Sequence, residues 1–194
     1  MIAQKINGGY SYTLATYALE FLHKAEHLFG SKTNHYTFGG VEVAANATPM
    51  VWYPVIGGHQ YIMAQVTPDA LEDNREAMFQ LSHEMVHVLS PNGKPFTNNI
   101  EEGLAAWFSI RMTEEFAHDR SYAEQSVATS AYSYPCQLVT NLLLIEPDAI
   151  RRLRMVQPVL GLVTAADFVA AGLTAVPHCL IEELVKPMNY TLIN

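Results

Sequence analysis

The chain has 194 residues and a formal net charge of −8, and 49% of its residues are hydrophobic against 15% charged. This composition excludes disorder over most of the chain, and the length predicts one domain, residues 1–194, with its own core. The negative charge excludes a nucleic-acid surface, which needs a basic patch. The densest basic cluster, Arg151-Arg152-Leu153-Arg154, is expected to form one exposed helix face.

The N-terminus and the cysteines both bear on the compartment of the protein. Residues 1–9 lack the apolar core of a signal peptide, and no segment is long and apolar enough to cross a bilayer. We therefore expect a cytoplasmic location and no membrane partner. Cys136 and Cys179 are the only cysteines, and nothing in their spacing demands a disulfide, so both are expected to be buried free thiols.

The first predicted element is a helix over Tyr12 to Phe29, whose apolar residues recur at helical spacing and which ends at Gly30. His23 and His27 are four residues apart on it, as two metal ligands would be. No glutamate follows the first of them, and Lys24 and Glu26 indicate a solvated edge. We interpret this histidine pair as a surface pair.

Between Tyr36 and Val66 the hydrophobic period changes to that of strands. Val41 and Val43 alternate with their neighbours, and two further apolar runs, Val51 to Ile56 and Tyr61 to Val66, flank the hairpin connection Gly57-Gly58-His59-Gln60. Pro54 is expected to push its strand toward an edge or a bulge. The pattern predicts a small sheet of about three strands.

A second helix is predicted from Thr67, as N-cap, to the region of Ser90-Pro91. It contains the motif His83-Glu84-Met85-Val86-His87. Histidines four apart project from one helix face and can hold two corners of a tetrahedral zinc site, while Glu84 can reach a water on the metal. The alternative is an accidental motif in a buried helix, which is disfavoured because buried histidines and carboxylates are costly without partners.

The rest of the chain is predicted to be helical. A helix from about Asn99 to Glu114-Glu115-Phe116 has Asn98 or Asn99 as N-cap. The helices expected after it cover Tyr122 to Ser130, Pro135 to Ile145, Pro147 to Met155, Thr164 to Ala171 and His178 to Val185. The fold class is therefore α+β, with a helix, a sheet and the motif helix in residues 1–90 and a helical subdomain in residues 91–194.

The motif helix followed by Glu102-Gly103-Leu104-Ala105 resembles the gluzincin branch of the zincin metallopeptidases. The resemblance implies a zincin-like fold and makes Glu102 the third zinc ligand. Glu101 is the competing choice, since only one of two adjacent helical glutamates can face the metal; its alternative role is a solvated residue of the first turn. The 14 residues between His87 and Glu102 are fewer than in the larger family members, but the loop from Ser90 to Thr97 can turn tightly enough to return the second helix.

The resemblance also implies parts of a substrate site. In zincins a sheet edge lies along the peptide substrate, and Tyr61 to Val66 is the stretch that we expect in this place; the alternative is an ordinary core strand. Related chains place a tyrosine near the site, at the start of a helix, where it can stabilise an oxyanion. Tyr132 and Tyr134 are the candidates, and His118 is a more distant one. Their alternative role is to pack a helix junction.

The expected function is that of a zinc-dependent metallopeptidase. Zn²⁺ would be held by His83, His87 and Glu102, and Glu84 would act as general base on the attacking water. The partner would be a peptide or protein substrate, and a regulatory or toxin-like protease with one protein target would use the same chemistry. Two other classes stay open: a zincin-like protein-binding module with weak or no catalysis, and a helical structural protein with an accidental motif.

Overall fold

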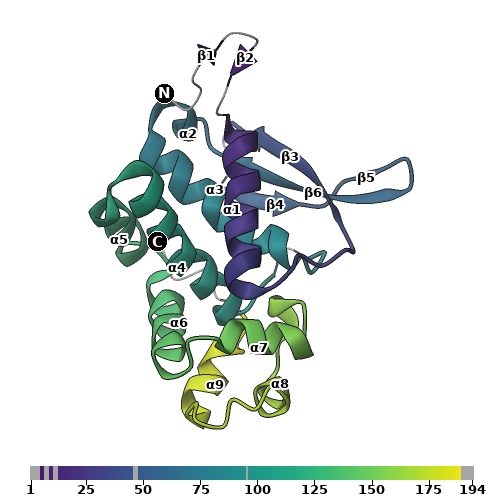
Figure 1. Cartoon of the computed structure of the whole chain (residues 1–194), viewed down its shortest axis with the longest axis vertical. Helices are drawn as coiled ribbons and strands as arrows, with labels where there is room; N and C mark the ends of the chain where they lie inside the picture. The colour runs from purple at the N-terminus through teal and green to yellow at the C-terminus, as the bar shows by residue number, and fades with distance from the viewer. Residues whose placement is uncertain (1–4, 7–8, 11–12, 46–47, 95, 189–194) are drawn as a thin grey trace.

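The structure is a computed structural model that describes residues 5–6, 9–10, 13–45, 48–94 and 96–188. It has the predicted α+β class, with a sheet beside the N-terminal helix and helices over the rest of the chain (Figure 1). A short hairpin, β1 (Lys5–Ile6) with β2 (Gly9–Tyr10), precedes α1 (Leu14–Phe29), which ends at Gly30 as predicted. Thr13 caps α1, and the apolar side of the helix packs on α3.

The larger sheet contains β3 (Thr37–Val43), β4 (Met50–Trp52), β5 (Val55–Ile56) and β6 (His59–Val66). β6 lies in the centre, parallel to β3 on one side and antiparallel to β4 on the other. β5 pairs with the beginning of β6 across Gly57 and Gly58, whose φ angles of 60° and 81° suit a tight hairpin turn. Pro54 separates β4 from β5, so the predicted single strand is divided.

The expectation that Tyr61 to Val66 forms a substrate-binding edge is wrong. This segment pairs on both sides, so its backbone groups are already used by β3 and β4. Sequence could not show this, because the partner of a strand is set by the chain crossover from β3 and not by the strand's own residues. Among the described strands, β4 is the edge on the side of the site.

The motif helix is also shorter than predicted. Instead of one helix from Thr67, the chain forms α2 (Asp69–Glu72), which begins after Pro68, and α3 (Asn74–Leu89). Asp73 separates them because its backbone is extended and its carboxylate accepts a hydrogen bond from the N–H of Arg75, as an N-cap does. Thr67 is tied to α3, since its N–H donates to Oε1 of Gln80 at 2.8 Å.

The second half is helical as predicted. It contains α4 (Asn99–Ala117), α5 (Arg120–Ala128), α6 (Ser133–Ile145), α7 (Ala149–Val156), the 3₁₀ turn η1 (Leu160–Leu162), α8 (Ala165–Ala170) and α9 (His178–Leu184). α3 and α4 pack closely against each other, and α4 also packs on α6. The loop between α3 and α4 thus returns the second helix as expected. Within the described residues, no helix is long and apolar enough to cross a membrane.

The histidine pair on α1 and the two cysteines differ in how far they follow the predictions. His23 and His27 are exposed on α1, as expected for a surface pair. Cys136 and Cys179 are free; Cys136 is buried, but Cys179 is exposed, so the prediction of two buried thiols is wrong for Cys179. It lies on the outer side of the short helix α9.

The prediction of one exposed basic face on α7 is wrong for Arg154, which is only 6% exposed. Its guanidinium donates hydrogen bonds to backbone carbonyls instead of facing water. The acceptors are the carbonyls of Phe29, Gly30, Ser31, Leu89 and Pro158. The ends of α1 and α3 therefore hold this cation in the interior, which no local pattern around Arg154 reveals.

Candidate metal centre

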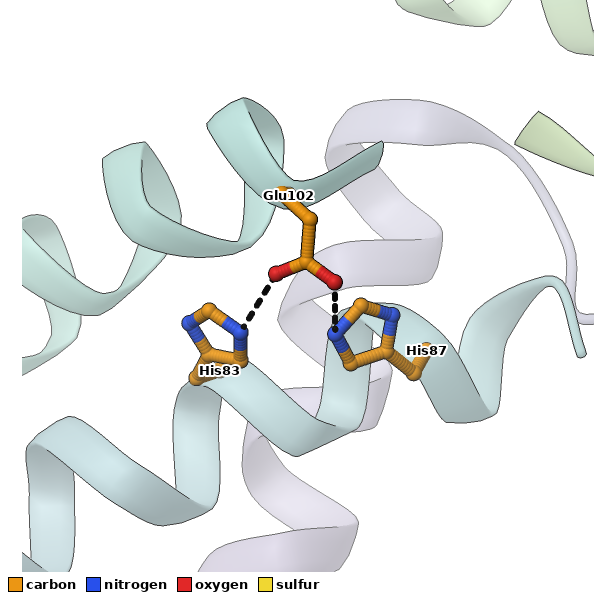
Figure 2. Close-up of side chains that lie close together, drawn as sticks. All are labelled: His83, His87 and Glu102. Atoms are coloured by element: carbon orange, nitrogen blue, oxygen red, sulfur yellow. Dashed lines mark hydrogen bonds and ion pairs between the residues drawn. The ribbon is translucent and has the colours of Figure 1, made fainter. Parts of the chain in front are cut away.

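Two helices bring three ligand-type side chains together. His83 and His87 lie one turn apart on α3, and Glu102 lies in the first turn of α4, facing them (Figure 2). Oε2 of Glu102 is 3.2 Å from Nε2 of His83, and Oε1 is 3.6 Å from Nε2 of His87. One ligand atom from each residue lies within 4.8 Å of the other two, and all three residues are buried. This group can hold a metal ion.

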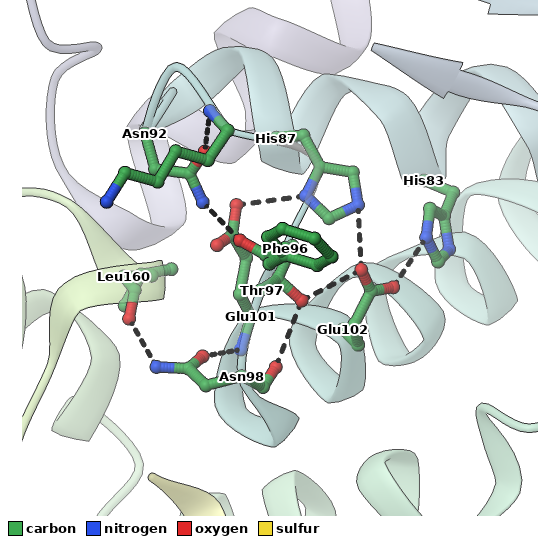
Figure 3. A network of polar contacts seen from close by, with 10 residues as sticks. His83, His87, Asn92, Phe96, Thr97, Asn98, Glu101, Glu102 and Leu160 are labelled. Carbon is green, nitrogen blue, oxygen red and sulfur yellow. Dashed lines mark hydrogen bonds and ion pairs between the residues drawn. The ribbon is translucent and has the colours of Figure 1, made fainter. Parts of the chain in front are cut away.

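The structure separates the two adjacent glutamates. Glu102 faces the Nε2 atoms of both imidazoles, whereas Oε1 of Glu101 lies 2.9 Å from Nδ1 of His87, on the other side of that ring (Figure 3). Glu101 is 1% exposed, so the alternative of a solvated first-turn residue is wrong. The helix turns this side chain inward, toward His87.

Glu84 lies beside the group without joining it. It is 2% exposed, and its Oε2 atom has no hydrogen-bond partner in the part of the chain that the structure describes. Burial raises the pKa of Glu84; the nearby imidazoles of His83 and His87 oppose this shift, and the charge of Glu102 adds to it. A carboxylate with a raised pKa and an unused oxygen is suited to accepting a proton.

A cavity of about 530 Å³ opens over these residues. One wall is the start of the sheet edge, Thr48 to Val51 with Tyr53, and another is the loop after α3, with Asn92, Lys94 and Thr97. His83, Glu84, His87, Glu101, Glu102, Ala131 and Tyr132 complete the lining. A second cavity of about 290 Å³ shares Thr48, Pro49, His83, Glu84 and Tyr132, and extends toward Asp69 and Glu76 on α2 and α3.

The structure distinguishes the two candidate tyrosines. Tyr132, at the N-terminal end of α6, lines both cavities, and its ring centroid is 4.7 Å from that of His83. Tyr134 is 50% exposed and donates a hydrogen bond to Glu183, so it is not brought to the cavity. The more distant candidate, His118, is the exposed C-cap of α4, at the opposite end from Glu102.

Charge is concentrated in the centre. Burial lowers the pKa of His87, but the carboxylates of Glu102 and Glu101 outweigh this effect and raise it to about 10. Burial raises the pKa of Glu101, against the hydrogen bond and positive charge of His87. Burial also raises the pKa of Tyr132, and the charges of Glu102 and Glu84 add to this, so its phenol stays protonated and can donate a hydrogen bond.

The first turn of α4 is held by contacts that sequence reasoning missed. Oγ1 of Thr97 donates to Oε1 of Glu102 at 2.9 Å. Asn98 caps α4 through the N–H of Glu101, and its amide also donates to the carbonyl of Leu160 at 2.9 Å (Figure 3). Only the capping role of Asn98 had a sequence signal; the partners of Thr97 and Leu160 depend on tertiary packing.

The C-terminal segment holds the same turn from outside. The N–H of Asn99 donates to the carbonyl of Lys186, and the N–H of Met188 donates to the carbonyl of Thr97.

Comparisons of the chain with protein-family models, with curated proteins and with solved structures each found no match.

Proposed function

We propose that the protein is a zinc-dependent metallopeptidase with a zincin-like fold, of the gluzincin type. One observation carries this proposal: the buried group of His83, His87 and Glu102 shares a cavity with Glu84, a buried carboxylate that keeps an unpartnered oxygen. Two imidazoles and one carboxylate form a three-residue set of the kind found in catalytic zinc sites, which leaves one position open. A purely structural zinc site would use a fourth protein ligand.

The donor set fits a metal ion. Three buried, polar side chains converge with their ligand atoms within 4.8 Å, and Thr97 orients Glu102 from behind. Two imidazole nitrogens and a carboxylate oxygen are ligands that suit zinc, although they also bind other divalent ions. A zinc ion held here supplies Lewis-acid polarisation of a carbonyl and lowers the pKa of water.

Glu84 is the residue that we assign to proton transfer. Its raised pKa suits a group that takes a proton from the attacking water and then delivers it to the departing amine. Its side chain lines the same cavity as the three ligand-type residues but is not part of the group whose ligand atoms converge. It is therefore a candidate general base and not a fourth ligand.

Tyr132 is the candidate for stabilising the oxyanion. It lines the cavity next to His83, and its raised pKa keeps the hydroxyl protonated as a donor. A hydrogen bond aimed at a developing oxyanion typically contributes about 3 kcal/mol to the lowering of the barrier. Tyr134 is exposed and donates to Glu183 instead, so we do not assign it this role.

The substrate would be a peptide lying along β4. This strand is an edge, it begins at the cavity wall, and Met50 and Val51 line the cavity over the metal ligands. An edge strand offers main-chain hydrogen bonds that do not depend on peptide sequence. Glu84 lines both cavities, which would then serve as side-chain sites for the residues that flank the cleaved bond.

The test replaces Glu84 by glutamine. The zinc-loaded Glu84→Gln variant should cleave a mixed peptide library at least about 100-fold more slowly than the wild type, because its amide cannot accept the proton. It should still bind one zinc per chain. Glu146→Gln, at the C-terminal end of α6, is the matched control and should retain wild-type cleavage.

The outcomes separate the function classes. Cleavage by the wild type that is unchanged in Glu84→Gln would refute the role of Glu84. Zinc binding without cleavage of any peptide or of a folded protein panel would favour the protein-binding module. Absence of zinc binding by the wild type would refute the metallopeptidase proposal.

A further inference from the structure

Glu101 is a buried carboxylate beside the metal centre to which the proposed function assigns no role. It belongs to the first turn of α4, next to Glu102, and it is 1% exposed. Its Oε1 atom is 2.9 Å from Nδ1 of His87. Its Oε2 atom has no hydrogen-bond partner within the described part of the chain.

Burying a carboxylate oxygen without a hydrogen-bond partner costs folding free energy. An unpartnered buried oxygen typically costs about 1–3 kcal/mol, more when charged. The fold nevertheless provides room for it: a Cβ on Gly161, in η1, would lie 2.5 Å from Oε2 of Glu101. Gly161 is remote in sequence from the motif, and its lack of a side chain leaves the space that the Glu101 carboxylate occupies.

The geometry places Glu101 behind His87 and not beside the metal. The ring has two nitrogens, and Nε2 faces Glu102 while Nδ1 faces Glu101. Imidazole ligands commonly donate their second N–H to a carboxylate, which fixes the ring tautomer and orientation. A competing role as third ligand would require Glu101 to face Nε2, which it does not.

We propose that Glu101 is a positioning residue that accepts the Nδ1–H hydrogen bond of His87 and thereby directs the Nε2 lone pair to the metal. This inference rests on the proposed function, since it assumes that His87 is a ligand. Glu101 acts through His87, because its Oε1 atom faces Nδ1 of that ring and not the Nε2 atom that faces Glu102. Its effect is on metal affinity and on the electronic environment of the ligand.

The first experiment measures zinc affinity by competition with a chromophoric chelator. Glu101→Leu removes the acceptor at similar size and should weaken zinc binding about 10- to 100-fold. Glu101→Gln keeps a carbonyl oxygen that can accept from Nδ1, so it should recover most of this loss. Glu26→Gln is the control. Glu26 is a partly buried carboxylate on α1, and it accepts a hydrogen bond from the N–H of Lys32.

Gly161→Ala provides a second route that leaves Glu101 itself intact. The added methyl group would meet Oε2 of Glu101 at 2.5 Å and Nδ2 of Asn92 at 2.8 Å, so the carboxylate must move. Its zinc affinity should fall in the same direction as that of Glu101→Leu. Circular dichroism of the metal-free variants identifies any that fail to fold, and Gly161→Ala and Glu101→Gln then decide.

A measurement on the wild type needs no variant. In a long-range ¹H–¹⁵N spectrum of the zinc-loaded protein, His87 should carry its proton on Nδ1 and its metal on Nε2. Metal on Nδ1, or zinc affinity and cobalt absorption spectrum in Glu101→Leu and Gly161→Ala equal to the wild type, would overturn the positioning role. A wild type that binds no zinc would instead refute the proposed function.

Discussion

Glu101 and Glu102 are neighbours on α4, and their side chains leave the helix about 100° apart. That rotation is sufficient to send Glu102 to the Nε2 atoms of both histidines and Glu101 to the Nδ1 atom of His87. Two residues of the same type thus have different partners. The sequence offered both as candidate ligands, and the packing of α4 on α3 distinguishes them.

Gly103 follows this pair and determines how closely α6 can approach α4. A Cβ at this position would lie 2.2 Å from the carbonyl oxygen of Pro135 and 2.7 Å from Cγ2 of Val139. The residue is therefore required for packing, in addition to its place in the Glu-Gly motif. The backbone of α6 cannot move away without disturbing Tyr132, which precedes that helix.

We predict that Gly103→Ala lowers the free energy of unfolding by about 2–3 kcal/mol, even though alanine is the better helix former. Urea unfolding of the metal-free protein measures this change. The double variant Gly103→Ala, Val139→Ala should not recover the loss, because the closest contact is with a backbone atom. Full recovery in the double variant would show that the Val139 side chain was the obstacle.

At the scale of elements, the site depends on the relative position of α3 and α4. Leu89, the last residue of α3, offers its carbonyl to Arg154 of α7 and to the N–H of Thr33. The first turn of α4 is held by Leu160 and by residues 186–188. Segments far along the chain therefore fix both helices that carry the ligands.

We predict that Arg154→Lys destabilises the protein by about 3 kcal/mol, because a lysine ammonium cannot replace the planar fork that serves several buried carbonyls. Thermal unfolding measures the effect. Arg151→Lys is the matched control: Arg151 lies on the same helix and donates to carbonyls at the end of α1, but it is exposed. Equal effects of the two substitutions would contradict the stabilising role of the buried hydrogen bonds from Arg154 to the ends of α1 and α3.

At the scale of the whole molecule, the metal-free centre couples stability to pH. The pKa of His87 is about 10 in the folded chain against an ordinary value of 6.5. A raised pKa means that the folded state holds the proton more tightly than the unfolded state does. The resulting stability is complete below pH 6.5 and is lost as the pH rises through about 10. The raised pKa values of Glu84 and Glu101 act in the same direction.

We therefore predict that the chelator-treated protein loses stability between pH 6.5 and pH 10, as measured by urea unfolding. Zinc requires neutral imidazoles, so its affinity should instead increase over the lower part of this range. His87→Gln should flatten the pH dependence of the metal-free protein, whereas His23→Gln, at an exposed position on α1, should leave it unchanged. A metal-free protein that gains stability toward pH 10 would contradict this coupling.

Local sequence patterns predicted most elements and the pairing of His83 with His87, whereas the choice of Glu102 over Glu101 came from the resemblance to gluzincins. Helical periodicity located α1 and the C-terminal helices, and the spacing of His83 and His87 placed both on one face. The patterns failed where a distant partner decides the outcome. The central position of β6, the burial of Arg154 and the turn of Glu101 toward His87 each depend on segments that are remote in sequence. The division at Asp73 was missed because a continuous hydrophobic pattern conceals an internal cap.

The proposed metal centre is tested by measuring the metal content of the purified protein, prepared without chelator and supplied with zinc, by elemental analysis. The wild type is compared with the double variant His83→Ala, Glu102→Ala, and circular dichroism confirms that both are folded. We expect one zinc per chain in the wild type and almost none in the variant. Equal zinc in the two proteins, or none in either, would contradict a metal centre formed by His83, His87 and Glu102.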